Sequence, residues 1–282
     1  MDPSLQIRQA TNADTSEIAE LLSRSPHVHR HLDWQAVLDW LPNDPFLVIR
    51  NESCLLGLLA CPPDPEYIAW IRCFACTQDF DLKQIWTLLI NSVINSPSLT
   101  GSTLYSVGLN NWFSNLLANS GFINFQNIVV LKWNQRIPQP KQIASGYLVR
   151  PMESHDIQDV ALLDKLAFEA MWVNSADKIA LAYYQAEHAL VAEIDGEIIG
   201  YELSTANHFS AHLARIAIHP KHQREHIGSN LVTEMFKYFH RRGIYQITVN
   251  TQDDNTSSLN LYQSLGFIRT GESFPVYRYP LE

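Results

Sequence analysis

The residues from Ile216 to Leu231 are of types and in an order that could bind an anionic cofactor. A β-branched run ends at Pro220, a short polar loop follows, and an apolar period typical of a helix begins near Ile227. The first turn of a helix has unpaired backbone N–H groups and the positive end of the dipole, so it favours a phosphate or pyrophosphate. Gly228 has no Cβ and lets the backbone approach a bulky anion. Taken alone, the pattern fits an ordinary strand-to-helix connector equally well.

The loop resembles the acyl-CoA signature of the GCN5-related N-acetyltransferase (GNAT) superfamily: Gln or Arg, two residues, Gly, one residue, then Gly or Ala. Gln223 and Gly228 match, whereas His226 stands in place of the first glycine and still supplies a backbone N–H. A second family element, with Asn, a small residue, Leu-Tyr and Leu-Gly-Phe, is matched by the stretch from Asn255 to Phe267. The chain is therefore identified as a member of this superfamily by resemblance.

The resemblance implies acetyl-CoA as co-substrate and no metal. The backbone of Ile216–Ile218 would bind the pantetheine arm in the manner of an added strand, and the helix start would hold the pyrophosphate. The coenzyme-binding residues that it implies are Ile216, Ala217, Ile218, Gln223, Arg224, Glu225, His226, Ile227, Gly228, Ser229, Asn255 and Ser258.

The implied reaction is direct attack of a primary amine on the thioester, which needs a base for the amine proton and an acid for the departing thiolate. Tyr262, in the family's Leu-Tyr position, is the expected acid, and a packed aromatic is the alternative. His212 is the expected base, because the strand Ala211–His219 is similar to a strand of arylalkylamine N-acetyltransferases whose first histidine falls there. A hydrogen-bonded strand histidine explains it equally well, and Glu202 on the neighbouring strand is the second candidate base.

In this fold the acceptor enters between the loop that joins the first two helices and the final strands. Glu169 could attract a cationic amine, and Trp172 or Phe274 could lie against it. Solvated acids and aromatics packed at a rim explain these residues as well. We expect a small-molecule or peptide amine as acceptor. Two alternatives stay open: a peptide or protein α-amino acetyltransferase, and a non-catalytic acyl-CoA-binding regulator.

Periodicity and turn residues predict the elements that position these residues. Asp195–Gly196 predicts a hairpin, and Gly243 predicts the end of a long helix. The fold class that we predict is α/β (α+β), with two tandem GNAT (acyl-CoA N-acyltransferase) domains, each a mixed, mostly antiparallel sheet flanked by helices. In the second half the expected order is a strand near 147–150, helices near 156–168 and 176–187, three strands between 189 and 219, a helix at 227–242, a strand at 245–250, a helix at 257–264 and a final pair of strands.

The first half repeats this order at an offset of 142 residues, which drifts to 145 near the end. Ile7–Arg8 matches Val149–Arg150 in this alignment. Between the copies, the polar stretch Asn134–Gly146 has two prolines and no apolar period, which is typical of a linker. We therefore predict a degenerate first domain at 1–135, a linker at 136–146 and a catalytic domain at 147–282.

The first copy lacks the features that would bind the coenzyme. Its loop has no glycine, Asp79 and Asp81 place negative charge where the pyrophosphate would dock, and Leu117 takes the position of the tyrosine. We expect this copy to bind no coenzyme and to act structurally. Cys73 and Cys76 are expected to be buried thiols on opposite faces of a strand rather than a metal or redox pair.

Composition limits the partners of the chain. Its 282 residues have a formal net charge of −9 and are 46% hydrophobic, which is ample for packed cores. An acidic chain without a Lys/Arg cluster argues against nucleic acid, and no apolar stretch approaches the ~20 residues of a membrane span. Four cysteines do not make a disulfide scaffold. We expect a cytoplasmic protein that is a monomer (a pseudo-dimer of domains) or a homodimer, with no membrane partner.

Overall fold

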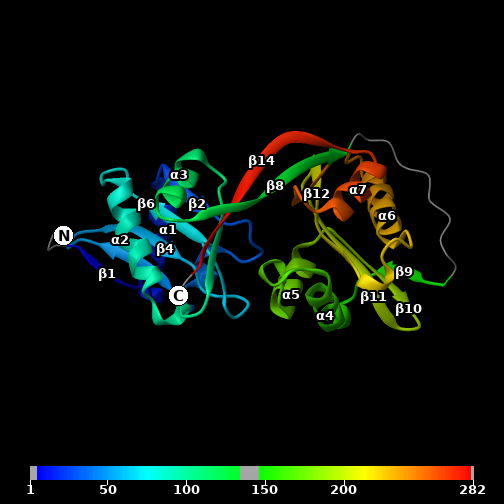
Figure 1. Cartoon of the computed structure of the whole chain (residues 1–282), viewed down its shortest axis with the longest axis horizontal. Helices are drawn as coiled ribbons and strands as arrows, with labels where there is room; N and C mark the ends of the chain where they lie inside the picture. The colour runs from blue at the N-terminus through cyan, green and yellow to red at the C-terminus, as the bar shows by residue number, and fades with distance from the viewer. Residues whose placement is uncertain (1–4, 134–145, 281–282) are drawn as a thin grey trace. The chain divides into compact units, whose positions relative to one another are not determined.

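The computed structural model describes residues 5–133 and 146–280, and the chain divides into two compact units. The first unit comprises residues 1–126 and 274–282, and the second comprises residues 127–273 (Figure 1). This division differs from the predicted domains, because residues 127–133 belong to the second unit and residues 274–280 to the first. Of the predicted linker, residues 136–145 lie outside the described residues.

The second unit is built on a mixed sheet with the strand order β8, β13, β12, β11, β10, β9. Neighbouring strands are antiparallel, except that β12 and β13 are parallel. Helices α4 and α5 lie on one side of this sheet and α6 on the other (Figure 1). The elements are β8 (Ile123–Trp133, from residue 127 on), β9 (Leu148–Pro151), α4 (Ile157–Ala167), α5 (Ala176–Gln185), β10 (His188–Ile194), β11 (Glu197–Ala206), β12 (Ser210–Ile218), α6 (Ile227–Arg241), β13 (Gln246–Gln252) and α7 (Thr256–Ser264).

Helix α6 is amphipathic, and its apolar stripe forms the core on its side of the sheet. Leu231, Met235, Phe236 and Phe239 are all fully buried. Trp133, at the end of β8, stacks on Phe236 with the ring centroids 4.1 Å apart. This packing fixes α6, and with it the start of the helix, against the strands.

Positive φ angles confirm two predicted turns. Asp195 and Gly196 have φ of 50° and 86°, as a two-residue hairpin turn between β10 and β11 requires. Gly243, with φ of 75°, follows the end of α6. Within residues 5–133 and 146–280, no helix is both long and apolar enough to cross a membrane.

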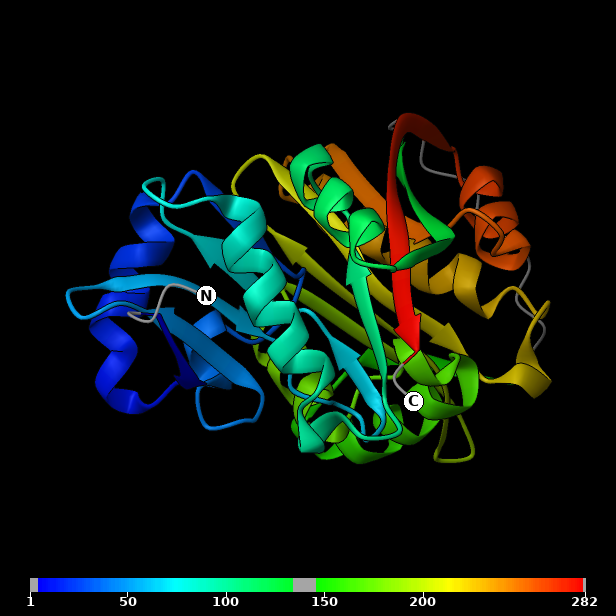
Figure 2. The ribbon, with the colours of Figure 1, turned by 60° about the vertical axis from the view of Figure 1, so that its left-hand side comes forward.

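The first unit has two sheets, with the strand orders β1, β3, β4, β6, β2 and β5, β7, β14. Residues 68–76, which match the strand of residues 210–218 in the second copy, form two strands, β5 and β6, that belong to different sheets. Helix α2 lies along one face of the larger sheet (Figure 2). The elements are β1 (Gln6–Gln9), α1 (Thr15–Arg24), β2 (His27–Arg30), β3 (Phe46–Arg50), β4 (Leu55–Ala60), β5 (Ile68–Trp70), β6 (Cys73–Cys76), α2 (Leu82–Ile94), β7 (Thr103–Val107) and α3 (Asn111–Asn119).

The two cysteines of β6 confirm that its faces pack against different helices. Cys73 belongs to the core cluster of Ile18 from α1, and Cys76 to the cluster of Ile85 from α2. Burial raises the pKa of the Cys73 thiol to about 12 and that of Cys76 to about 11. Both thiols are therefore unreactive core residues.

The last strand, β14 (Phe267–Pro280), is one strand rather than the predicted pair. Its residues 276–280 pair antiparallel with β7 of the first unit, whereas residues 128–132 of β8 pair antiparallel with β13 of the second. Strand β8, which ends the first copy in sequence, thus pairs within the second unit, and β14, which ends the second copy, pairs within the first unit. The sequence pattern of a strand does not specify its partner strand. The predicted domain boundaries were therefore placed at the linker between the copies.

Candidate active site

Strands β12 and β13 run side by side for only part of their length. Residues 210–213 pair with residues 246–249, and the pairing ends there. Ala214 is an extra residue in the ladder between β12 and β11, which places a bulge at this point. In the described part of the chain, residues 215–218 have a strand partner on the β11 side alone. Their other edge is open to an extended ligand.

Helix α6 begins beside this open edge without a side-chain cap. Its N-cap residue, His226, has a left-handed backbone with φ of 63°, and its side chain does not bond the helix. The N–H of Asn230 donates to the His226 carbonyl at 3.0 Å. The N–H groups of Ile227, Gly228 and Ser229 come before this first bond, so they are available to an anion. The left-handed backbone at His226 is one that glycine adopts without strain.

The strand edge and the helix start meet in one cleft of about 680 Å³. Eleven of the twelve residues predicted to bind the coenzyme line it. The exception is Glu225, whose carboxylate lies 3.2 Å from Nδ1 of His222. A Cβ on Gly228 would lie 3.2 Å from Cδ2 of Leu261 across the cleft, so the glycine keeps this passage open. The cleft is also lined by residues that the sequence analysis missed, namely Ala167, Phe168, His222, Ser257, Asn260 and Leu261.

Helical spacing could have identified the missed residues of α7. Asn255 is the N-cap of α7, and its Oδ1 accepts a hydrogen bond from the N–H of Ser258 at 3.0 Å. Asn260 and Leu261 follow Ser257 by three and four residues, so they lie on the same helix face. The family element covers only some positions of α7, and helical periodicity predicts the other residues of this helix that line the cleft.

Tyr262 lies beneath the cleft in the core between α7 and the sheet. It is 3% exposed and packs edge-on against Phe267. Burial raises the pKa of its phenol well above the ordinary value, while a hydrogen bond with Ser258 and the charge of Arg215 act in the opposite direction. The phenol is thus neutral, and its partner Ser258 lines the cleft.

The two candidate bases lie in different surroundings. His212 is in the paired part of β12, with Nδ1 2.9 Å from Oγ1 of Thr248, and burial lowers its pKa. Glu202 is fully buried, bonded to Nδ1 of His188 at 2.8 Å and to Ser204, whose hydroxyl also contacts Met235 of α6. None of Glu202, His212 and Tyr262 lines the cleft, and Glu202 differs from His212 in facing α6. This geometry does not support it as a base for the cleft.

The predicted acceptor residues are only partly brought together. Glu169 is exposed at the start of a short turn at 170–172, and the carbonyl of Trp172 accepts a hydrogen bond from Arg215. Phe274 is half-buried and belongs to the first unit, because β14 passes from one unit to the other there. The second unit by itself therefore groups Glu169 and Trp172 and leaves Phe274 out.

In the first copy, the strand edge and the helix start are occupied by the chain itself. Strand β2 pairs antiparallel with β6, the strand that matches residues 215–218. Asp81 caps α2, accepting hydrogen bonds from the N–H groups of Lys83 and Gln84 at 2.8 and 3.0 Å. A cavity of about 430 Å³ at the end of β6 is lined by three carboxylates, Glu17, Glu20 and Asp79, and by Arg24, which pairs with Glu20, so its net charge is negative and opposes an anion.

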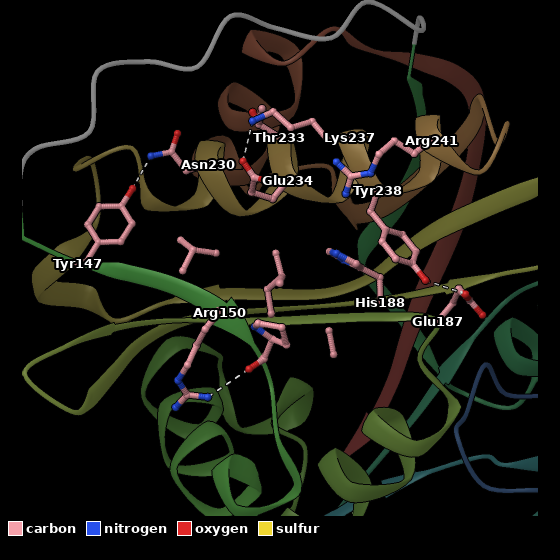
Figure 3. A pocket seen from close by; sticks show the side chains of 14 residues that line it. Tyr147, Arg150, Glu187, His188, Asn230, Thr233, Glu234, Lys237, Tyr238 and Arg241 are labelled. Carbon is pink, nitrogen blue, oxygen red and sulfur yellow. Dashed lines mark hydrogen bonds and ion pairs between the residues drawn. The ribbon is translucent and has the colours of Figure 1, made fainter.

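A second cavity of the second unit, of about 730 Å³, lies between α6 and the strands β9 and β10 (Figure 3). One end is closed by a hydrogen bond between the Asn230 amide and the Tyr147 hydroxyl. His188 and Tyr238 lie near the other end, with their ring centroids 4.5 Å apart. None of the predicted site residues lines this cavity, so it is separate from the coenzyme cleft.

The chain is similar to known acetyltransferases in sequence and fold. Residues 157–267 match the model of the acetyltransferase (GNAT) family. A GCN5-related N-acetyltransferase from Sphaerobacter thermophilus superposes with a TM-score of 0.64 at 14% identity, covering 100% of this chain and 97% of that one. A tandem GNAT protein from the clavulanic acid biosynthesis pathway gives 0.62 at 13%, covering 99% of both chains. A GCN5-related N-acetyltransferase from Kribbella flavida gives 0.70 at 13%, covering 98% of this chain and 71% of that one.

The chain as a whole has the tandem GNAT fold, as the sequence predicts, and the match to the GNAT family model covers the part of the second unit that contains the cleft.

Proposed function

We propose that the second unit transfers an acetyl group from acetyl-CoA to a primary amine by direct attack. The observation that carries this proposal is the cleft that joins the open edge of residues 215–218 to the uncapped start of α6. An extended amide-rich arm fits the first feature and a pyrophosphate fits the second.

The residues of the chain have distinct tasks in this reaction. The N–H groups at the start of α6 bind the pyrophosphate, and the edge of β12 bonds the pantetheine arm. His212, a neutral imidazole because burial lowers its pKa, accepts the amine proton directly or through water. As the new C–N bond forms and the C–S bond breaks, Tyr262 gives its phenolic proton to the departing thiolate and regains one from solvent.

The first copy is proposed to bind no acetyl-CoA. Strand β2 covers the edge that pantetheine would use, and Asp81 occupies the N–H groups that pyrophosphate would use. The chain therefore holds one equivalent of coenzyme. The proposal includes a cytoplasmic enzyme without a metal whose acceptor is a small-molecule or peptide amine, and these points rest on the sequence resemblance.

Two measurements test the proposal. Acetyl-CoA binding is measured by calorimetry, and release of the CoA thiol is followed with a panel of small amines, amino sugars and peptides with free N-termini. We expect binding together with turnover on at least one amine. Turnover on peptides alone would select the α-amino acetyltransferase. Binding without turnover would select the non-catalytic regulator, and the absence of binding would reject both.

A matched pair of charge reversals tests the location of the coenzyme. Arg224 lines the cleft, whereas Arg241, at the far end of α6, lies outside it. Arg224→Glu should weaken acetyl-CoA binding about tenfold or more, and Arg241→Glu should change it less than about twofold. Equal effects of the two substitutions would show that only overall charge matters.

A further inference from the structure

One buried ion pair of the second unit joins the strand of the cleft to the loop on the acceptor side. Arg215 directly follows the bulge of β12, and its guanidinium forks onto Asp164 of α4, with Nε–Oδ2 and Nη2–Oδ1 distances of 2.8 and 2.9 Å. The side chain of Asp164 is fully buried and that of Arg215 is 14% exposed. Both groups are therefore held in a single geometry.

The pair holds the loop of residues 168–174 at three places. Nη2 of Arg215 donates to the carbonyl of Trp172, and the N–H of Asn174 donates to Oδ1 of Asp164 at 2.7 Å. The guanidinium lies over the ring of Phe168, 3.6 Å from the ring centroid. Phe168 itself lines the coenzyme cleft. The pair thus fixes both the cleft end and the far end of this loop.

A neighbouring tyrosine completes the set of donors around the carboxylate. The hydroxyl of Tyr201, on β11, donates to Oδ2 of Asp164. Tyr201 is fully buried, and desolvation raises its pKa well above the ordinary value, so it remains a neutral donor. Each carboxylate oxygen of Asp164 thus accepts two hydrogen bonds, which is what a buried carboxylate requires.

Comparison of the two copies separates this pair from the structural ion pairs of the fold. Arg150 forks onto Asp156 in the second copy just as Arg8 forks onto Asp14 in the first, so this pair belongs to the common scaffold. At the same offset of 142 residues, the first copy has Leu22 in place of Asp164 and Cys73 in place of Arg215. The matching positions of the first copy therefore form no ion pair, although Arg72, next to Cys73, makes a buried pair with Asp33 at 2.9 Å.

We propose that Arg215 and Asp164 are positioning residues that hold the loop of residues 168–174, and through it the acceptor amine, against the bulge of β12. This inference rests on the proposed function, because it assigns that loop to the acceptor. Neither residue of the pair lines the cleft, so its effect falls on the geometry of attack rather than on coenzyme binding.

The test compares Arg215→Lys and Asp164→Asn with Arg150→Lys, which alters the scaffold pair. With the best amine of the panel, we expect the first two variants to lower kcat/KM for the amine about 10- to 100-fold, with acetyl-CoA affinity within about threefold of wild type. Arg150→Lys should leave both quantities near wild type. Equal losses in all three variants, or a loss confined to acetyl-CoA affinity, would overturn the inference.

Hydrogen exchange separates failure of this inference from failure of the proposed function. The Asn174 amide should exchange at least about tenfold faster in Asp164→Asn than in wild type, because its acceptor is weakened. If the wild-type protein is inactive while Asp164→Asn still shows the faster exchange, the proposed function is rejected, and with it the acceptor role of the loop. An active protein whose Asn174 exchange is unchanged would reject the positioning role alone.

Discussion

Asp81 and His226 occupy matching positions in the two copies, as the N-cap residues of α2 and α6. The carboxylate of Asp81 accepts hydrogen bonds from its own helix at 2.8 and 3.0 Å. The side chain of His226 makes no such bond, and its backbone is left-handed. One copy therefore satisfies its helix start internally, and the other leaves it open to an anion.

Removal of the Asp81 cap should destabilise the first unit without creating a coenzyme site. Asp81→Ala should lower the free energy of unfolding by about 1 kcal/mol, whereas Asp81→Asn, which keeps an acceptor, should lower it less. Urea unfolding measures both. Neither variant should bind a second acetyl-CoA, because β2 still covers the strand edge. A second equivalent bound by Asp81→Ala would show that the cap alone blocks the site.

His226→Gly should stabilise the second unit. A non-glycine residue with φ of 63° is strained, so glycine should raise the free energy of unfolding by about 0.5–1 kcal/mol after its larger entropy in the unfolded chain is counted. Thermal unfolding measures the change. Acetyl-CoA affinity should be retained or improved, since the backbone N–H stays. Loss of affinity in this variant would show that the imidazole itself contacts the coenzyme.

Tyr262→Phe should slow the reaction while leaving the core intact. The ring keeps its packing against Phe267, but the proton for the thiolate is lost. We expect kcat to fall by about 10- to 1000-fold with little change in acetyl-CoA affinity. Pre-steady-state thiol release measures the chemical step. An unchanged rate would make Tyr262 a packing residue only.

Protonation of His212 should produce the acidic limb of the pH–rate profile. Burial lowers its pKa, so the imidazole is neutral and able to accept a proton at pH 7 and loses this ability only below its ordinary value of about 6.5. The rate should therefore be level above that pH and fall as the solution becomes more acidic. His212→Ala should remove this limb and lower kcat. A limb that persists in the variant belongs to another group.

Short contiguous motifs predict which residues lie close together better than they predict the path of the chain. Residues 216–229 and the start of α7 form such motifs, and eleven of the twelve residues predicted to bind the coenzyme line one cleft. Strand pairing across long separations is not encoded in such motifs. The sequence therefore did not predict the exchange of β8 and β14, nor that Phe274 and Glu169 belong to different units.

The missed contacts depend on side-chain direction. Glu202 and Tyr201 are adjacent in sequence, yet Glu202 faces α6 and Tyr201 bonds Asp164 of α4. The alternation of a strand gives opposite faces but does not say which face meets the acceptor. Likewise Asp164 and Arg215 are 51 residues apart and carry no common motif, so their pairing required the fold.

The central claim is that one acetyl-CoA binds, in the cleft of the second unit. Titration calorimetry on the full chain and on Gly228→Leu tests it most directly, because a side chain at Gly228 would fill the passage beside Leu261. We expect the wild-type chain to bind one equivalent and the variant to bind none, while circular dichroism shows that the variant keeps its fold. Two equivalents in the wild type, or undiminished binding in Gly228→Leu, would contradict it.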